Sequence, residues 1–400
     1  MSNQHKDETN LNKSSQSSDY FQKFIRPVEN SHALQLALLF IAIGLIVIVA
    51  LMTVYIFNIR KNNKDTVSKP QAQINVNELA NNNNDNINSE PDEELLSIIP
   101  RRLDGLMVAR DDANKIPVCV MIENAAFDGV RPQSGLSAAS VVYEIIVEGG
   151  ITRLMAVYTG DSADPVGPVR SARDTYLEFA SELDCMYTHA GGSYTAMSSL
   201  QNNGYKDLDA LRESKYFWRD NNKYSPHNLF TKTDNLYEAV IKGHGWLDEP
   251  VYDSWQFVDA SESRLHSGDE NYISEISINF DGAYDVNYKF NSDNNNYERY
   301  NGGTAHTDAN TGSILTANNV IIETVPPGWY IEGKGRINFA VTGEGKVHIF
   351  KEGEMIEGTW KKPDRLARTK FYDASGQEIE LLRGNSWVEI VPEDKNFDWQ

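Results

Sequence analysis

The chain has 400 residues, of which 40% are hydrophobic and 24% charged, and its formal net charge is −20 at pH 7. This composition is that of ordinary globular proteins, and the length is sufficient for two or more domains. The negative charge argues against nucleic acid as a partner, because binding phosphates requires clustered lysine and arginine, and it also disfavours docking of the protein surface on anionic lipid.

Residues 33–59 predict a single transmembrane helix. The segment reads ALQLALLFIAIGLIVIVALMTVYIFNI and contains no charged residue. About 20 apolar residues span a bilayer core, so this stretch is long enough to cross it with some tilt. The apolar core is too long for a cleaved signal peptide, and the segment has no cysteine that could carry a lipid. We therefore expect the chain to be held in the cytoplasmic membrane through residues 33–59.

The charges beside this span do not decide its orientation. The basic residues that flank it are Lys6, Lys13, Lys23 and Arg26 before it, and Arg60, Lys61, Lys64 and Lys69 after it. The counts are equal, and the charges nearest the membrane lean slightly towards a cytoplasmic C-terminus. Residues 1–32 form a short tail, and residues 60–98 form a linker with the run NNNNDN. Both have too little apolar surface to offset the entropy of ordering, so both are predicted to be disordered.

The rest of the sequence predicts two folded domains, at residues 99–265 and 266–400. In the first, residues 117–122 (PVCVMI) are typical of a buried strand, and residues 140–160 predict a hairpin that turns at a Gly-Gly pair. A helical stretch (VRSARDTYLEFASELD), another strand (CMYTHA) and a short helix follow, so we predict an α+β or α/β domain. The second domain has short alternating runs such as ISINF, NVIIETV and WVEIV, which predict a mostly β domain.

The two cysteines, Cys119 and Cys185, each lie in an apolar run. We expect them to be buried and reduced, because a disulfide would need an oxidising compartment and close Cα atoms. No metal-ligand spacing such as C-x-x-C or H-E-x-x-H occurs, so the sequence indicates neither a metal site nor a cofactor.

The predicted hairpin carries a charged cluster. In a regular strand Glu144 and Glu148 share one face, because strand side chains alternate with period two. A two-residue loop at Gly149-Gly150 would place Arg153 opposite Ile146, on the same face and within reach of both glutamates. Residues four apart on a flat strand are about 13 Å apart, whereas paired glycosidase carboxylates are about 5–10 Å apart. The cluster is therefore either a buried set of salt bridges or the floor of a ligand site.

Three further motifs supply candidate residues. GPVRSAR places Arg170 and Arg173 near the start of a predicted helix, where they could bind an anion together with free backbone N–H groups or simply pair with a nearby carboxylate. HAGGS places His189 and Ser193 before a helix; it resembles a nucleophile elbow only loosely, and Ser193 is better explained as a helix cap. YSPHNLF places His227 and Asn228 in a loop, where binding residues are often found.

Several runs together resemble the YerB-like bacterial envelope proteins, a family named for domain of unknown function 3048. They are RPQSGLSAASVVYEIIVEGGITR, VGPVRSAR, HAGGS, SPHNLF, NGGTAHTDANTGSILTANNVII and TKFYDASGQEIELLRGNSWVEIVP. The resemblance covers about residues 100 to 395. It implies a two-domain protein held outside the cytoplasmic membrane, often as a lipoprotein, and it implies no established activity. In this chain a predicted transmembrane helix stands in place of the lipid-attachment cysteine.

Three functions stay open at this point. The first is binding of a cell-wall glycan or peptide by residues of the four motifs: Glu144, Glu148, Arg153, Arg170, Arg173, His189, Ser193, His227 and Asn228. The second is an enzyme acting on a wall polymer, with Glu144 or Glu148 as acid or base and His189 or His227 assisting. The third is a structural or assembly role in the envelope. Binding is favoured, because no motif carries a complete mechanism while the charged groups suit recognition.

Overall fold

The computed structural model describes residues 98–127, 129–261 and 272–400. The predicted transmembrane span at residues 33–59, the tail at 1–32 and the linker up to residue 97 lie outside the described residues. Among the residues that are described, no helix is long and apolar enough to cross a membrane. The described residues all belong to one compact unit.

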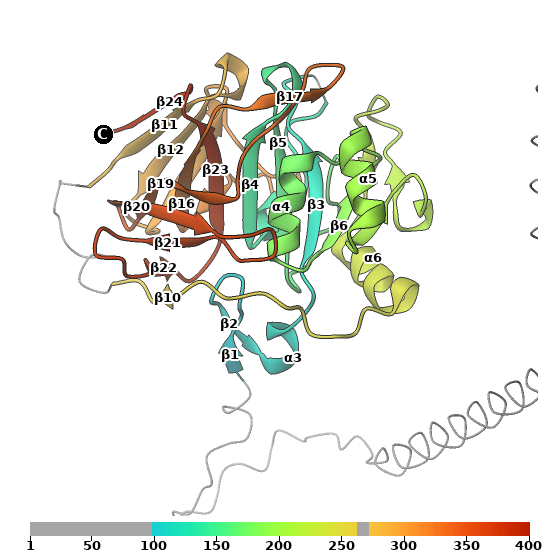
Figure 1. Cartoon of the computed structure of the whole chain (residues 1–400), viewed down its shortest axis with the longest axis horizontal. Coiled ribbons are helices and arrows are strands. Elements are labelled where there is room, and N and C mark those ends of the chain that lie inside the picture. Colours follow the sequence, from blue (N-terminus) through green and yellow to red (C-terminus); the bar gives the residue numbers. More distant parts are fainter. Residues whose placement is uncertain (1–97, 128, 262–271) are drawn as a thin grey trace, which may run out of the picture. The chain divides into compact units, whose positions relative to one another are not determined.

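A mixed ten-stranded sheet runs through both halves of this unit (Figure 1). Its strands, in spatial order, are β21 (Lys370–Tyr372), β20 (Glu354–Lys362), β19 (Gly343–Lys351), β16 (Asn319–Val325), β23 (Ser386–Pro392), β4 (Val141–Ile146), β5 (Thr152–Tyr158), β3 (Val118–Glu123), β6 (Met186–His189) and β7 (Lys206–Asp209). The halves meet where β23 pairs in parallel with β4. The division into two domains near residue 265 stays a prediction. The ten-stranded sheet contains strands from both sides of that residue.

A second, antiparallel sheet is built from the later part of the chain. Its strands are β14 (Thr304–Ala305), β13 (Asn296–Asn301), β12 (Val286–Asn291), β11 (Glu275–Asn279) and β24 (Asn396–Trp399), with β15 (Thr316–Ala317) paired to β13. From residue 272 onward the described chain has strands and one short 3-10 turn but no α-helix. The prediction that this region is mostly β is confirmed.

Short helices and small strand pairs complete the described fold. The helices are α3 (Arg110–Ala113), α4 (Asp174–Glu182), α5 (Tyr194–Asn202) and α6 (Thr233–Glu238), which a π-helical turn (Ala239–His244) follows. The two-stranded pairs are β1 (Ile98–Pro100) with β2 (Met107–Ala109), β8 (Trp218–Arg219) with β9 (Leu229–Phe230), β10 (Phe257–Val258) with β22 (Leu381–Leu382), and β17 (Trp329–Glu332) with β18 (Arg336–Asn338). The strands predicted at residues 117–122, 140–160 and 185–190 correspond to β3, the β4–β5 pair and β6.

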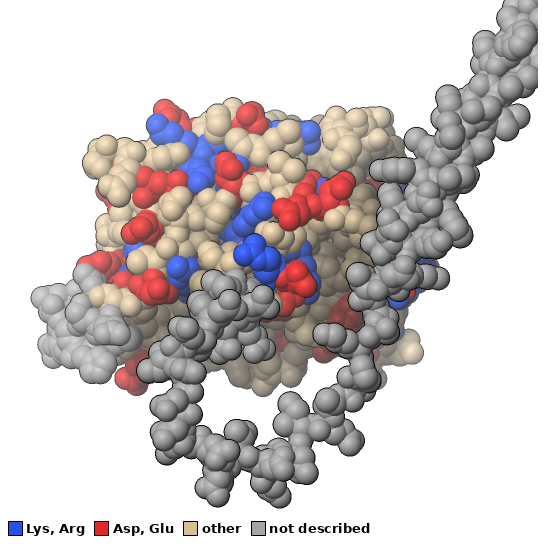
Figure 2. Space-filling view, turned by 90° about the horizontal axis from the view of Figure 1, so that it is seen from below, with Lys and Arg blue, Asp and Glu red and all other residues tan. Residues whose placement is uncertain are grey.

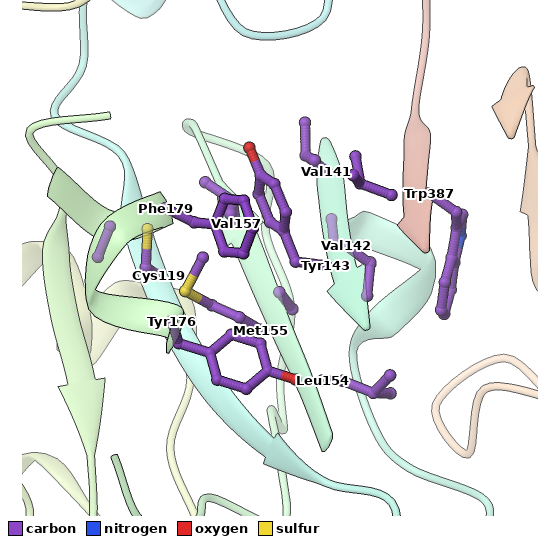
Figure 3. Close-up of a cluster of buried hydrophobic side chains, with 14 of the residues drawn as sticks. Cys119, Val141, Val142, Tyr143, Leu154, Met155, Val157, Tyr176, Phe179 and Trp387 are labelled. Atoms are coloured by element: carbon purple, nitrogen blue, oxygen red, sulfur yellow. The ribbon is translucent and has the colours of Figure 1, made fainter. Parts of the chain in front are cut away.

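Helix α4 packs on one face of the central strands (Figure 3). Tyr176, Phe179 and Ala180 recur at helical spacing and are buried there. The ring of Phe179 stacks on Tyr143 of β4, with 4.6 Å between the ring centroids. On the other face of the same strands, Trp387 lies beside the apolar side chains of β4 and β5. Both faces of the sheet are therefore covered, which explains why its strands are continuous apolar runs.

The two cysteines form a disulfide in the structure. Cys119 lies on β3, and Cys185 immediately precedes β6, the parallel neighbour of β3. Their Cα atoms are 6.0 Å apart, and both residues are buried. The prediction of burial is confirmed, whereas the prediction of reduced thiols is wrong. Pairing of β3 with β6 brings together two residues separated by 66 positions, and no local pattern reports such a pairing.

The β4–β5 connection is longer than predicted. The N–H of Val147 donates to the carbonyl of Ile151 at 2.7 Å, and Glu148–Gly150 form a 3-10 turn in which both glycines have positive φ. Arg153 is therefore opposite Ile145 and not Ile146. This shift of one residue places Glu144 and Arg153 on opposite faces of the sheet, so the predicted Glu144–Arg153 contact is wrong.

Candidate functional site

Most of the motif residues gather at one edge of the ten-stranded sheet. Strands β3, β4 and β6 run in one direction and β5 in the other, so the ends of the first three and the start of β5 share this edge. Glu123 ends β3, His189 ends β6 and Arg153 lies near the start of β5. In Figure 1 this edge is at the top, beside the β17 label. Carboxyl ends of neighbouring strands are common positions for binding sites in α/β sheets.

Glu123 organises the first charged group at this edge. Its buried carboxylate lies 3.1 Å from Nε of Arg170 through Oε1 and 2.8 Å from Nδ1 of His227 through Oε2. The side chains of Arg170 and His227 are 23% and 24% exposed. No described residue forms a hydrogen bond with the two Nη atoms of Arg170 or with Nε2 of His227. One buried carboxylate thus holds two side chains whose outer nitrogen atoms are available to a ligand.

Backbone pairing explains how Arg170 reaches this position. The segment before α4 runs extended beside β3, where the N–H of Glu123 donates to Pro168 and the N–H of Arg170 donates to Met121. Arg170 is therefore outside the helix, and only Arg173 lies at its start, as the N-cap residue. The prediction that both arginines lie near the start of the helix is therefore wrong for Arg170, because its segment pairs with β3 instead of forming helix.

The loop that carries His227 is held by its neighbour Asn228. The Asn228 side chain donates to the carbonyls of Asp220 and Lys223 and accepts a hydrogen bond from Arg219 at 2.7 Å. Its polar atoms are therefore committed to the protein. The ring of Phe127 packs edge-to-face against His227, with 6.0 Å between centroids. Asn228 positions the loop, and His227 presents its free nitrogen.

A second charged group follows along the same edge. Arg173 donates two hydrogen bonds to Glu148, one of them 2.7 Å long from Nε, and Nη2 of Arg153 lies 3.7 Å from the same carboxylate. Burial opposes ionisation of Glu148, but the hydrogen bond from Arg173 and the charge of Arg153 outweigh it and lower the pKa of Glu148 to about 2. Of the predicted Glu144–Glu148–Arg153 cluster, the contact between Glu148 and Arg153 is present, Arg173 joins it, and Glu144 is not part of it. Glu148 is a poor proton donor near neutral pH, which weighs against an acid role.

Glu144 lies on the opposite face of the sheet and has no exposed surface. Its carboxylate pairs with Arg299 of β13 and accepts a hydrogen bond from Asn124 at 3.1 Å. Arg299 also lies 3.7 Å from Glu389 of β23, which accepts a hydrogen bond from Tyr288 at 2.5 Å. These groups connect the two sheets, and a wall polymer has no access to Glu144. The geometry gives no support to Glu144 as the acid or base of an enzyme.

His189 and Ser193 are buried and fully engaged with the protein. The Nδ1 atom of His189 lies 2.8 Å from the carbonyl of Gly191, and its Nε2 lies 2.7 Å from Asp207. Ser193 accepts a hydrogen bond from the N–H of Ala196 at the start of α5, which confirms the predicted cap, and donates to Asp174. Neither side chain presents a free polar atom to a ligand.

Two important residues escaped the sequence reasoning. Glu123 had a detectable signal, because it is an ionisable residue at the end of a continuous apolar strand, where a buried charge requires partners. Arg299 had none, because it pairs with a glutamate 155 positions away. In the part of the chain that the structure describes, no group of three His, Cys, Asp or Glu residues could hold a metal ion.

The opposite end of the molecule has a different surface (Figure 2). On the visible part of that face, basic and acidic side chains are interspersed, and neither sign forms a continuous patch. A mixed surface of this kind offers no extended site for a highly charged polymer. The charged edge of the sheet is therefore the better candidate for a specific site.

The fold and the site define an α+β protein with two sheets, in which polar motif residues converge on one edge of the larger sheet. The chain belongs to the YerB-like family. Residues 103–246 match the family model described as "Protein of unknown function (DUF3048) N-terminal domain", and residues 276–388 match the corresponding C-terminal domain. The resemblance noted from the sequence motifs is confirmed.

A curated protein and a solved structure are similar to the chain over most of its length. "Putative lipoprotein YerB" of Bacillus subtilis (strain 168) is 29% identical over 300 residues, which cover 73% of this chain and 86% of the relative. The crystal structure of the YerB protein from Bacillus subtilis matches with a TM-score of 0.66 at 25% identity, over 75% of this chain and 99% of that chain. Neither description names a ligand or a reaction.

Proposed function

We propose that the chain is a membrane-tethered envelope protein that binds an anionic group of a cell-wall ligand, such as the carboxylate of a wall peptide, at Arg170, with His227 beside it as an acceptor for a neighbouring polar group of the ligand. The observation that carries this proposal is the arrangement around Glu123. Its Oε2 is hydrogen-bonded to Nδ1 of His227, its Oε1 forms an ion pair with Arg170 at Nε, and the outer nitrogen atoms of both side chains stay free.

The chemistry of the edge suits an anion. Nδ1 of His227 faces a carboxylate and therefore carries a proton, which leaves Nε2 of the neutral ring as an acceptor for an N–H or O–H group of the ligand. Arginine binds carboxylates through paired N–H donors in a fixed geometry, and burial of Glu123 restricts the orientation of Arg170 before the ligand arrives. Arg153 and Arg173 add positive charge nearby.

Isothermal titration calorimetry of the full-length chain in nanodiscs, with a wall stem peptide as the ligand, tests the proposal. Arg170→Gln removes the anion contact and is expected to weaken binding at least tenfold, about 1.4 kcal/mol. Arg110→Gln is the matched control, because it removes the same charge from an exposed position on α3. Binding that is equal in the Arg170→Gln variant and the parent chain would rule out this site.

The proposal places residues 60–400 outside the cytoplasmic membrane, with residues 33–59 as the span. Two observations support it: the relative is named a lipoprotein, and the disulfide is of the kind formed in oxidising compartments. Proteinase added to spheroplasts should degrade the folded region. Its complete protection until lysis would reverse the orientation.

A further inference from the structure

A separate cleft lies between the helices and the β17–β18 hairpin. Its cavity volume is about 380 Å³, within the range of about 300–1,000 Å³ that is common for small-molecule sites. Helices α4 and α5 form one wall, and the end of the hairpin with residues 339–342 forms the other. Neither Arg170 nor His227 lines this cleft, so it is a different site from the one proposed above.

The cleft has an apolar floor and an aromatic rim. Leu177, Phe339 and Val341 line the floor and are buried. Trp329 and Tyr205 line the cleft as well, and Trp329 is 47% exposed. A large, exposed indole ring offers a flat apolar surface. Exposure of such a ring to water is unfavourable, and no packing within the described chain accounts for it. Flat rings of this kind match the C–H faces of sugar rings.

The polar lining offers both donors and acceptors. Asn338 accepts a hydrogen bond from Thr175 at 2.7 Å through Oδ1, and no described residue accepts from its Nδ2. Glu178 accepts a hydrogen bond at 3.4 Å through Oε2 only. The exposed Asn203 lines the cleft with no described hydrogen bond from its side chain. Sugar hydroxyl groups both donate and accept, so this mixture fits a polyhydroxyl ligand.

The charge of the cleft disfavours an anionic ligand. Asp174 and Glu178 contribute two negative charges, and Arg365 contributes one positive charge. Arg365 is also engaged with the protein, because it donates to Ser181 at 3.1 Å and lies 5.1 Å from the ring centroid of Tyr205. A carboxylate or phosphate would therefore meet net repulsion, whereas a neutral ligand would not.

We infer that this cleft binds a neutral glycan, such as a short oligomer of N-acetylated amino sugars, with a sugar ring stacked on Trp329. The inference is independent of the anion site at Arg170. A glycan and a peptide carboxylate could then be bound at two different places on one molecule.

Titration of the full-length chain in nanodiscs with the β-1,4-linked N-acetylglucosamine tetramer, followed by calorimetry, tests the inference. Trp329→Ala is expected to weaken binding at least tenfold, and Asn203→Ala is expected to weaken it severalfold without disturbing the hairpin. Tyr330→Ala is the matched control, because Tyr330 is the next residue, is 76% exposed and does not line the cleft. Thermal unfolding of each variant checks that the fold is retained.

To distinguish the two sites, each variant is also titrated with the ligand of the other site. Arg170→Gln should leave binding of the tetramer unchanged, and Trp329→Ala should leave binding of the stem peptide unchanged. Absence of saturable binding of the tetramer, or equal affinity in the parent chain and in both cleft variants, overturns the inference. It is also overturned if an amidated, uncharged wall peptide binds in the cleft and the tetramer does not.

Discussion

Buried charged residues in this protein pair with partners that are distant in the sequence. Glu182 of α4 accepts a hydrogen bond from Lys362 at 2.9 Å and also pairs with Arg368, and none of the three is exposed by more than a few per cent. Lys362 and Arg368 are 180 and 186 positions away. A buried charge without its partner is strongly unfavourable, so such pairs constrain which arrangements of the chain can be stable.

Arg153 provides the first prediction at the residue scale. Its buried side chain contacts Glu148 and donates to the carbonyl of Ser171 at 3.1 Å. Arg153→Ala should lower the free energy of unfolding by about 3 kcal/mol. This is the lower end of the range for breaking a buried ion pair, because Glu148 is partly exposed and still has Arg173 as a partner. Arg153→Met should cost less, since it keeps the apolar stem packed. Urea denaturation measures both changes.

The control for this experiment is Lys242→Ala. Lys242 is 76% exposed and lies 3.7 Å from Glu238, so its loss should change the free energy of unfolding by less than about 1 kcal/mol. If Arg153→Ala costs no more than Lys242→Ala, the ion pairs at the sheet edge make no important contribution to stability.

Glu323 of β16 gives a prediction of pH dependence. Burial, followed by the negative charge of Glu182, raises its pKa from 4.5 to about 8. The folded protein therefore keeps this proton up to about pH 8, whereas the unfolded chain releases it near pH 4.5. The unfolded state binds fewer protons between these values, so this group lowers stability as pH rises, by at most about 1.4 kcal/mol per pH unit.

Glu323→Gln removes that titration and should make the decline in stability between pH 5 and pH 8 shallower. Part of the decline should persist, because burial and the charge of Glu144 also raise the pKa of Glu389 to about 8. Urea midpoints at pH 5, 6.5 and 8 measure the slopes, with the exposed Glu357→Gln as the control. Parallel slopes for Glu323→Gln and the parent chain would contradict the assignment.

Local sequence patterns could predict some of these residues and not others. The cap at Ser193 was predictable, because a cap depends on residues three positions apart. The register of β4 and β5 was not, because the same Gly-Gly pair is compatible with a two-residue loop and with the five-residue connection that forms. A shift of one residue moved Glu144 to the other face, where its partner Arg299 comes from another sheet.

At the scale of elements, strands were easier to predict than their neighbours in the sheet. β3 and β6 are short apolar runs and could be found from composition alone. Their parallel pairing depends on the crossover between them, which contains β4, β5 and α4 and leaves no local trace in either strand. The disulfide was mispredicted for the same reason, since it depends on that pairing.

The Cys119–Cys185 disulfide should make a large contribution to stability. It closes a loop of 66 residues, for which the chain-entropy model gives about 4 kcal/mol, mainly by restricting the unfolded chain. The Cys119→Ala, Cys185→Ala double variant should therefore unfold at a lower urea concentration than the oxidised parent. Dithiothreitol should lower the midpoint of the parent and leave that of the double variant unchanged. Two titratable thiols in the denatured, unreduced parent would show that the bond is not formed.

At the scale of the whole described region, the two halves share their core. β23 continues the sheet beside β4, Arg299 neutralises Glu144, and Glu182 is paired with basic residues from the later half. The change from a mixed pattern to a β pattern near residue 265 predicted two domains, and two family models match on either side of it. A local pattern reports which elements form, and it carries no information on whether two segments share one sheet.

This shared sheet leads to the last prediction, which concerns cooperativity. The described region of the full-length chain should unfold in one calorimetric transition, because separation of the halves would expose the β4–β23 edge and leave Glu144 and Glu182 without their partners. Fragments 98–261 and 272–400, expressed separately, should give poorly dispersed NMR spectra, and co-expression should restore a folded complex. Arg299→Met should weaken that complex, because it removes the charge that pairs with Glu144. Two separate transitions in the intact chain, or a native-like spectrum from fragment 98–261 alone, would show that each half is an independent domain.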